Sequence, residues 1–190
     1  GAEWRALDAE GSVIAEAPTL IVANAFDAKR LLPEARFPLS RVRGQVTFLP
    51  PAPDRALDIV VSGSGYVAPL PDGGHVVGAT YQHDDDGEDI RAAAHRENLA
   101  RAATMLPGFA EGLHPMDLDG LAGFRATIPD RLPIFGAPAQ PGVWAATGLG
   151  SRGLLWAPIG AELIASRLEG EPIPLPRDLA GAISPKRFLS

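Results

Sequence analysis

The sequence predicts an α+β fold built mainly from antiparallel strands, together with two strands of a different kind. Short apolar runs alternate with turns rich in Gly (21 residues) and Pro (19 residues), which is typical of many short elements. The runs 19–23 and 143–147 are apolar throughout, as in parallel strands buried on both faces. Helical spacing is clear in two long segments, 90–106 and 153–168.

The first part of the chain predicts a hairpin, then the apolar strand 19–23, and then a short helix over 25–32 that Pro33 ends. The middle is rich in strands, with the turn PDGG between two of them and a polar loop before the helix 90–106. The helix 153–168 is followed by a Pro-rich ending that we expect on the surface. The predicted strands are 3–8, 13–15, 19–23, 44–49, 57–61, 65–70, 75–80, 121–128, 134–136 and 143–147.

Composition excludes several classes of function. The chain has 190 residues, 46% hydrophobic and 21% charged, with a formal net charge of −6, so nothing in its bulk charge predicts that this piece alone binds nucleic acid. There is no cysteine, which excludes disulfides, thiolate metal sites and cysteine nucleophiles. No apolar run approaches the roughly 18 residues of a membrane span, and no signal peptide is visible. We expect a cytoplasmic protein, and a fragment whose beginning is missing, because the first residues already read as a strand.

Gly148, Gly150 and Gly153 form a G-x-G-x-x-G motif between an apolar strand and a helix. In a dinucleotide-binding βαβ unit, a strand ending in Asp or Glu follows about 20 residues later. Here the helix ends near Leu168 and no such strand follows, so the full fingerprint is not met. The G-x-S-x-G elbow of serine hydrolases is absent as well.

Two interpretations of the glycines stay open. They can form a tight turn that packs a helix close to a strand, or they can let backbone N–H groups approach a ligand. The first turn of a helix carries unpaired donors and a partial positive charge. Such an end suits a flavin ring, whose reduced form is anionic at N1–C2=O.

Four segments stand out through their joint order along the chain: LIVANAFDA, GYVAPLPDGGHVVGATY, FRATIPDRLPIFG and ATGLGSRGLLWAPIGAELIA. Together they resemble the C-terminal part of D-amino-acid-oxidase-type FAD-dependent oxidoreductases, the glycine oxidase and sarcosine oxidase group. The segments RGQVTFLP, HRENLARAATMLPG, LEGEPIPL and SPKRF are most similar to the oxidoreductase half of bifunctional enzymes that make 5-methylaminomethyl-2-thiouridine in tRNA. The resemblance covers nearly the whole chain.

The resemblance implies an antiparallel-sheet substrate domain together with a remnant of a Rossmann-like FAD domain. Residues 1–40 are then the FAD-domain remnant, 41–140 the substrate domain, and 141–190 the return to the FAD domain. The N-terminal segment that carries the family's true G-x-G-x-x-G is missing here, which puts FAD binding by this piece alone in doubt.

The activity implied is oxidation of the carboxymethylaminomethyl group on the wobble uridine of tRNA. The cofactor is FAD, the resulting imine hydrolyses to glyoxylate and a primary amine, and oxygen reoxidises the flavin. The partner half of such a protein is a methyltransferase that uses S-adenosylmethionine, and it lies outside this chain. Two alternatives are an oxidase of a free small amino acid and a binding module without catalysis.

The resemblance also implies roles for individual residues. Arg125 lies on a strand face shared with Gly123 and Thr127, and the family's arginine at this motif holds the amino-acid carboxylate, for which a guanidinium is suited. Tyr66 can add a hydrogen bond to that carboxylate or line the pocket. A solvated arginine and a plain sheet aromatic are the alternatives.

The residues expected along the cofactor come from three segments. Each segment also has a purely structural alternative: a packing turn for the first, a plain strand-to-helix turn for the second and an exposed strand start for the third. The expected cofactor contacts are Gly148, Gly150, Ser151, Arg152, Gly153 and Leu154 from the first segment, Asn24 and Ala25 from the second, and Gln45, with Arg43 beside it, from the third.

Two charged clusters receive a plainer interpretation. His83 with Asp84, Asp85 and Asp86 is read as a solvated loop rather than a metal site, because consecutive residues do not easily converge on one ion. Lys186 and Arg187 can touch tRNA, but a solvated tail is the simpler expectation.

Overall fold

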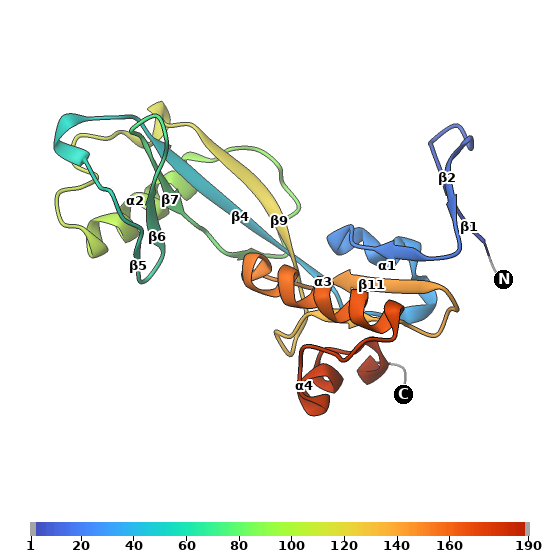
Figure 1. Ribbon diagram of the computed structural model, residues 1–190. Coiled ribbons are helices and arrows are strands. Elements are labelled where there is room, and N and C mark those ends of the chain that lie inside the picture. Colours follow the sequence, from blue (N-terminus) through green and yellow to red (C-terminus); the bar gives the residue numbers. More distant parts are fainter. Residues whose placement is uncertain (1–2, 189–190) are drawn as a thin grey trace. The chain divides into compact units, whose positions relative to one another are not determined.

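The computed structural model describes residues 3–188 and divides into two compact units (Figure 1). Unit 1 consists of the chain up to Ser40 and from Arg125 onward, and unit 2 is Arg41–Phe124. β10 (Ile134–Gly136) pairs with β11 (Val143–Thr147), which places the segment after Thr127 in unit 1. The assignment of residues 1–40, 41–140 and 141–190 to the FAD and substrate domains stays a prediction.

Unit 1 is built on a three-stranded sheet of order β10-β11-β3, in which β3 is Leu20–Val22. β11 pairs antiparallel with β10 and parallel with β3. The parallel pair agrees with the apolar pattern of both runs. Burial of β3 on both faces is wrong, however, because Ile21 is 47% exposed.

Helix α3 (Gly153–Glu169) packs on this sheet and is the longest helix of residues 3–188. Gly160 permits close packing, since a Cβ there would lie 2.1 Å from Phe135 Cε1. Pro158 lies inside the helix, and Gly170 ends it in the left-handed conformation (φ 72°). The described chain beyond α3 contains no strand, so the second strand of a dinucleotide-binding βαβ unit is absent there.

The remaining elements of unit 1 are short. The predicted hairpin is present as an antiparallel pair, while the helix expected over 25–32 is broken into a 3-10 turn and a single α turn. The ending is not a surface drape, because Ile183 is buried and its carbonyl accepts a hydrogen bond from Phe135 N (2.8 Å). These elements are β1 (Trp4–Leu7), β2 (Val13–Ala17), η1 (Ala25–Asp27), α1 (Ala28–Leu31), η2 (Pro33–Ala35), α4 (Arg177–Ala182) and η5 (Pro185–Phe188).

Unit 2 contains a six-stranded sheet of order β5-β6-β7-β4-β8, with β9 also pairing with β4. The β6–β7 hairpin forms around the PDGG turn as predicted. The polar loop 81–89 contains a short strand, β8. Of the strand expected over 57–61, only Val61 is in a strand, the two-residue β5. The strands are β4 (Ser40–Leu49), β5 (Val61–Ser62), β6 (Tyr66–Pro69), β7 (His75–Gly78), β8 (Gln82–His83) and β9 (Gly120–Thr127); the first residue of β4 and the last three of β9 belong to unit 1.

Helix α2 (Ala92–Met105) packs on the sheet of unit 2 and closes an apolar core. Leu99 and Ala102 meet Leu49, Val67 and Val77 there. The 3-10 turns η3 (Pro53–Arg55) and η4 (Pro115–Asp117) complete the unit. Across residues 3–188, none of the helices combines the length and the hydropathy that crossing a bilayer requires.

Candidate functional site

The glycine loop, residues 148–152, joins β11 to α3 in unit 1. Gly148 and Gly150 adopt positive φ angles of 71° and 57°, which L side chains rarely adopt. Gly148 is also required by packing, because a Cβ there would lie 2.3 Å from Ile128 Cδ1. The turn interpretation therefore explains these two glycines on backbone grounds.

Gly153, the first residue of α3, has neither constraint. A Cβ there would meet only Leu149, at 3.8 Å, which is an ordinary contact, and its φ is not positive. Nothing in the described chain requires glycine at this position. A ligand that approaches the backbone closely would require it, so Gly153 favours the cradle interpretation.

The start of α3 is open to solvent. Leu154 is 96% exposed and Leu155 is 76% exposed, an unusual arrangement for two leucines in sequence. The helix has no side-chain cap, since its N-cap residue is Arg152 and makes no capping hydrogen bond. Backbone donors of the first turn are thus left for water or a ligand, and the helix dipole gives that end a partial positive charge. Ser151 and Arg152 are both exposed beside it.

The loop after β3 lies next to the glycine loop. Because β3 and β11 are parallel, the chain leaves both strands at the same edge of the sheet. The hydroxyl of Thr147 donates a hydrogen bond to the carbonyl of Ala25 (2.7 Å), which joins the two loops. Ala25 itself has a positive φ of 53°, which is uncommon for a residue with a Cβ. The structure therefore brings the segment of Asn24 and Ala25 together with Gly148.

Arg125 lies beside the same loop through its strand. Gly150 N donates a hydrogen bond to the carbonyl of Ala126 (2.9 Å), the residue next to Arg125 on β9. Ala126 is buried and Arg125 is half-buried. The Thr127 hydroxyl donates to the carbonyl of Ser40 (3.3 Å) and fixes the end of the strand. A strand residue with a guanidinium is thus adjacent to the backbone contact that holds the glycine loop.

Tyr66 and Gln45 belong to unit 2. Tyr66 is half-buried on β6 and pairs with Gly78, where a Cβ would lie 2.9 Å from the phenol oxygen. The tyrosine ring therefore packs over a glycine of the neighbouring strand. Its contact with substrate stays a prediction.

The interpretation of Arg43 and Gln45 as an exposed strand start is wrong, because both side chains are fully buried. Arg43 donates to the carbonyl of Gly87 (2.7 Å) and to Gln82 Oε1 (2.7 Å). Gln45 Nε2 donates to the carbonyl of Arg91 (3.0 Å), and Gln45 Oε1 accepts from Arg91 N (2.9 Å). These side chains hold the polar loop against β4, and contact of Gln45 with a cofactor stays a prediction.

The same face of β4 continues into a buried polar network that the sequence did not predict. Thr47 Oγ1 lies 2.8 Å from His95 Nδ1, and Asn98 Nδ2 donates to Thr47 Oγ1 (3.0 Å). Burial lowers the pKa of His95. The available signal was the alternation of Arg43, Gln45 and Thr47 along one strand face, opposite polar residues of α2.

The acidic loop binds an arginine. Arg91 forms ion pairs with Asp85 and Asp89. Hydrogen bonds from Arg91 lower the pKa of both carboxyl groups, and the two carboxylates raise the pKa of Arg91. Among the described residues no cluster of His, Asp and Glu has the arrangement of a metal site.

The fold and this loop arrangement define a class of protein. The α+β fold with antiparallel sheets matches that of D-amino-acid-oxidase-type flavoenzymes. The family described as FAD dependent oxidoreductase matches residues 1–167. The chain belongs to this family.

Particular relatives carry the comparison further. The chain is 46% identical, over an alignment of 209 positions, to the tRNA 5-methylaminomethyl-2-thiouridine biosynthesis bifunctional protein MnmC of Burkholderia mallei (strain SAVP1). The protein of the same name from Burkholderia pseudomallei (strain 668) is equally similar. Each alignment covers 98% of this chain and 32% of the relative, so the chain spans about a third of the length of these relatives.

Solved structures agree on the fold. The iminodiacetate oxidase of Chelativorans sp. BNC1 superposes with a TM-score of 0.77 and 30% identity, covering 94% of this chain and 48% of that one. The glycine oxidase of Geobacillus kaustophilus gives a TM-score of 0.73 at 24% identity, covering 87% and 45%. The second likeness, at this identity, is one of fold alone.

Proposed function

We propose that this chain is part of an FAD-dependent oxidoreductase that removes the carboxymethyl group from 5-carboxymethylaminomethyl-(2-thio)uridine at the wobble position of tRNA, releasing glyoxylate. The full protein then also carries an S-adenosylmethionine-dependent methyltransferase and acts in the cytoplasm on tRNA. The observation that carries the proposal is the Gly150–Ala126 hydrogen bond, which holds the glycine loop next to Arg125. The similarity to the two bifunctional relatives supports the choice of substrate.

The residues present fit a flavin. The start of α3 offers backbone N–H donors that no side chain caps. Packing does not require a glycine at Gly153, and the exposed Leu154 adds an apolar surface beside these donors. Residues 148–154 would hold the ring, with Asn24 and Ala25 at the neighbouring loop. FAD, when bound, supplies a two-electron acceptor for oxidation of a carbon–nitrogen bond.

Arg125 supplies the anchor in this proposal. A guanidinium binds a carboxylate through two parallel hydrogen bonds, which fixes both the position and the angle of the substrate. The carboxymethyl carbon next to that carboxylate is thereby oriented for loss of its hydrogen. No side-chain nucleophile is needed, because the substrate imine hydrolyses with water.

A second candidate function is oxidation of a free small amino acid. The observation that favours it is the 30% identity and 0.77 TM-score with iminodiacetate oxidase. Iminodiacetate and a carboxymethylaminomethyl group share an N-carboxymethyl amine, so the same arginine would serve both substrates. The two functions differ only in what the amine is attached to.

The test uses the full-length protein loaded with FAD. It is given tRNA that bears the carboxymethylaminomethyl group, and separately free glycine and iminodiacetate, and glyoxylate is measured. We expect glyoxylate from the tRNA. Turnover of the free amino acids without turnover of tRNA contradicts the proposal and favours the second candidate.

Arg125→Ala in the same protein is expected to raise KM for the modified tRNA about 100-fold, because the variant lacks two charge-assisted hydrogen bonds to the substrate. The FAD absorption spectrum and FAD content are expected to stay unchanged. Arg96→Ala, at an exposed position on α2, is the matched control. Unchanged kinetics in Arg125→Ala would exclude the carboxylate anchor.

A further inference from the structure

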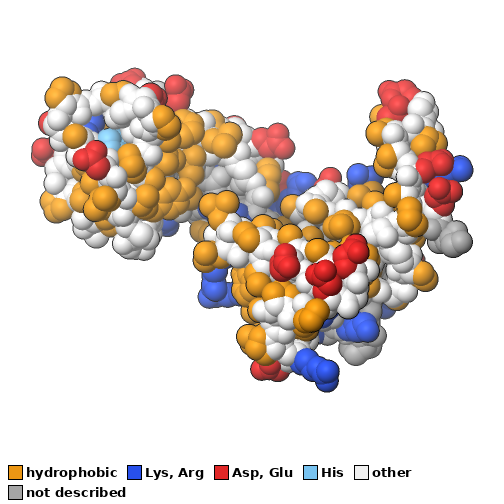
Figure 2. Space-filling model, viewed as in Figure 1, with side chains coloured by type: hydrophobic (Ala, Val, Ile, Leu, Met, Phe, Trp, Pro, Cys, Tyr) orange, Lys and Arg blue, Asp and Glu red, His pale blue; other side chains and the backbone are white. Residues whose placement is uncertain are grey.

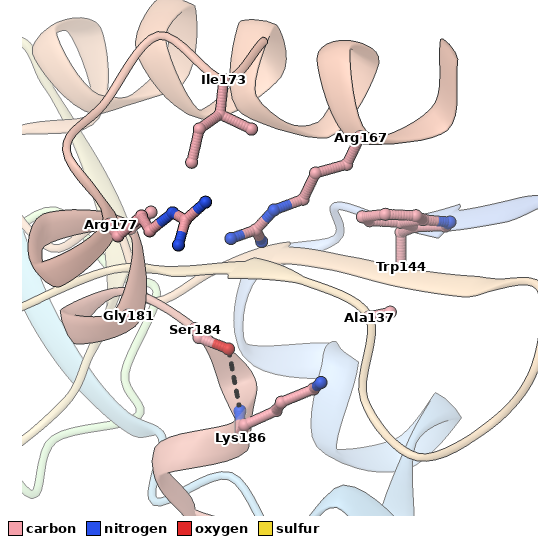
Figure 3. A pocket seen from close by; sticks show the side chains of 9 residues that line it. Ala137, Trp144, Arg167, Ile173, Arg177, Gly181, Ser184 and Lys186 are labelled. Carbon is pink, nitrogen blue, oxygen red and sulfur yellow. Dashed lines mark hydrogen bonds between the residues drawn. The ribbon is translucent and has the colours of Figure 1, made fainter. Parts of the chain in front are cut away.

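A pocket of about 450 Å³ lies in unit 1 among β11, α3, α4 and η5. Three basic residues line it, Arg167 from the last turn of α3, Arg177 from the start of α4 and Lys186 from η5, and no acidic residue does. Figure 3 shows the two guanidinium groups extending toward each other into the space, with the Trp144 ring beside Arg167. We call this the cationic pocket.

Within residues 3–188, no ion pair or hydrogen bond involves the charged groups of Arg167, Arg177 or Lys186. Two other arginines of unit 1 are paired, because Arg187 binds Asp130 (2.9 Å) and Arg5 binds Glu16 (2.7 Å). Like charges that converge without a counter-charge repel one another, and a bound anion relieves that repulsion.

The position of Arg167 is built into the fold. Gly136 adopts a φ of 143°, and a Cβ there would lie 3.0 Å from Arg167 Nη1 and 3.0 Å from Pro185 Cδ. The absence of a side chain at Gly136 therefore makes room for the guanidinium against the backbone of β10. The carbonyl end of α3 further favours a positive charge in its last turn.

The side chains that line the cationic pocket favour a phosphate group that is part of a larger molecule. Guanidinium groups bind phosphate through paired hydrogen bonds, and an ammonium adds a point charge. The Ser184 hydroxyl, which accepts from Lys186 N (3.3 Å), lies at the same wall. The volume is in the range of sites for larger ligands, and the Trp144 ring offers a surface for a ribose or base. Figure 2 shows Lys and Arg side chains on this part of unit 1, together with Asp and Glu side chains on the same face.

The cationic pocket is separate from the glycine loop. Arg167 follows Gly153 by 14 residues of one helix (167 minus 153), which is about 21 Å at 1.5 Å per residue. A small ligand bound at the glycine loop is therefore too short to contact Arg167 as well. A polymer with phosphates spaced along its length can occupy both ends of α3.

We propose that the cationic pocket binds a backbone phosphate of the tRNA whose wobble uridine is oxidised. This rests on the proposed function. The phosphate site anchors the substrate outside the reacting centre and does not touch the reacting atoms.

The test compares full-length FAD-loaded protein with the double variant Arg167→Gln/Arg177→Gln. For modified tRNA we expect KM to rise about tenfold, as when charge-assisted bonds to a phosphate are removed, with kcat unchanged. The slope of log Kd against log salt for tRNA is expected to fall by about 0.7–0.9 for each phosphate that the variant no longer neutralises. Oxidation of the free nucleoside, which has no phosphate, is expected to stay at the wild-type rate. Arg30→Gln, an exposed arginine of α1, is the matched control.

The outcomes separate the two proposals. If the wild-type protein does not oxidise modified tRNA, the proposed function itself fails. If it does, but the double variant keeps the wild-type KM and salt slope, the phosphate site is refuted. Inorganic phosphate is titrated alone by calorimetry as a further arm. Tight binding that is absent from the double variant, with KM for tRNA unchanged, would make the ligand a free phosphate and overturn the binding of tRNA there. Arg177→Gln alone, at an exposed position, keeps the test valid if the double variant folds poorly.

Discussion

The two units use polar side chains in opposite ways. Unit 2 buries a polar set on one face of β4, with Arg43, Gln45 and Thr47 fully covered and bonded to the loop and helix beside them. The main core cluster of unit 1 is apolar. The unit's cations Arg167 and Arg177 line an open pocket and have no partner among residues 3–188. The comparison teaches that a buried and hydrogen-bonded charge such as Arg43 has a structural role here. Charges that converge on a pocket without a described partner, such as Arg167 and Arg177, favour a bound ligand.

The largest test of this contrast is Arg43→Met. The change removes the hydrogen bonds that the buried guanidinium donates to the carbonyls of Gly87 and Asp89 and to Gln82. We expect the free energy of unfolding to fall by about 3–5 kcal/mol, since each hydrogen bond to a charged group contributes roughly 1.5–3 kcal/mol. Urea unfolding measures it. Arg177→Met, at an exposed cation of unit 1, is expected to change stability by no more than about 0.5 kcal/mol. Equal losses in the two variants would remove the distinction.

Gly160→Ala probes the apolar core of unit 1. The added Cβ would lie 2.1 Å from the ring of Phe135, so α3 must move away from β10. We expect a loss of about 1–3 kcal/mol, the usual range for overpacking. Gly181→Ala is the matched helical control, because a Cβ there meets nothing within 4 Å. It is expected to stabilise by about 0.5–1 kcal/mol through helix propensity. Thermal unfolding of the two variants compares them, and a harmless Gly160→Ala would contradict the close packing.

His95 makes the stability of unit 2 depend on pH. Burial lowers its pKa in the folded state, so the unfolded chain binds the proton more readily. The stabilisation is present above the unfolded pKa, about 6.5, and is lost as pH falls through that value toward the folded pKa. We expect the urea midpoint to drop between pH 8 and pH 5.5. His95→Gln is expected to show a smaller drop, and equal drops would exclude His95 as the cause.

The smallest expected effect is at the Asp130–Arg187 ion pair of unit 1. Burial raises the pKa of Asp130, but hydrogen bonds from Arg187 and from Leu132 N outweigh it, so the net shift is downward. The stabilisation is therefore present above the ordinary carboxyl pKa and lost as pH falls below it. Asp130→Asn is expected to cost about 0.2–1 kcal/mol at pH 7, as for partly exposed pairs. The difference from wild type, followed by urea unfolding, shrinks toward pH 3; a constant difference would point to packing instead.

Much of the fold could be predicted because local signals were strong. The PDGG turn, the spacing of Leu99, Ala102 and Leu106, and the apolar run 143–147 each correspond to one element of the structure. The ending could not be predicted, since the short α4 is held by tertiary burial of Ala180 and Ile183 rather than by helical periodicity. For the same reason Arg187 is not a solvated tail residue but pairs with Asp130.

The glycine loop was the predictable part of the candidate site, because φ and backbone access are properties of the glycines themselves. Its neighbours depend on the order of strands. Only the parallel pairing of β3 and β11 places Ala25 at the end of β11, and only the Gly150–Ala126 bond places Arg125 beside the loop. The cationic pocket could not be predicted, since Arg167, Arg177 and Lys186 come from three elements with no pattern linking them.

Pro158 gives the start of α3 a mechanical character of its own. A proline has no amide hydrogen, so the carbonyl of Leu154, four positions earlier, receives no bond from that position, and the ring presses against it. The first turn is therefore joined to the rest of the helix by one backbone hydrogen bond fewer than in a helix without proline. Proline sites of this kind are where helices bend. The backbone N–H groups at the start of α3 can therefore shift slightly when a ligand binds, while the second half of the helix stays packed on the sheet.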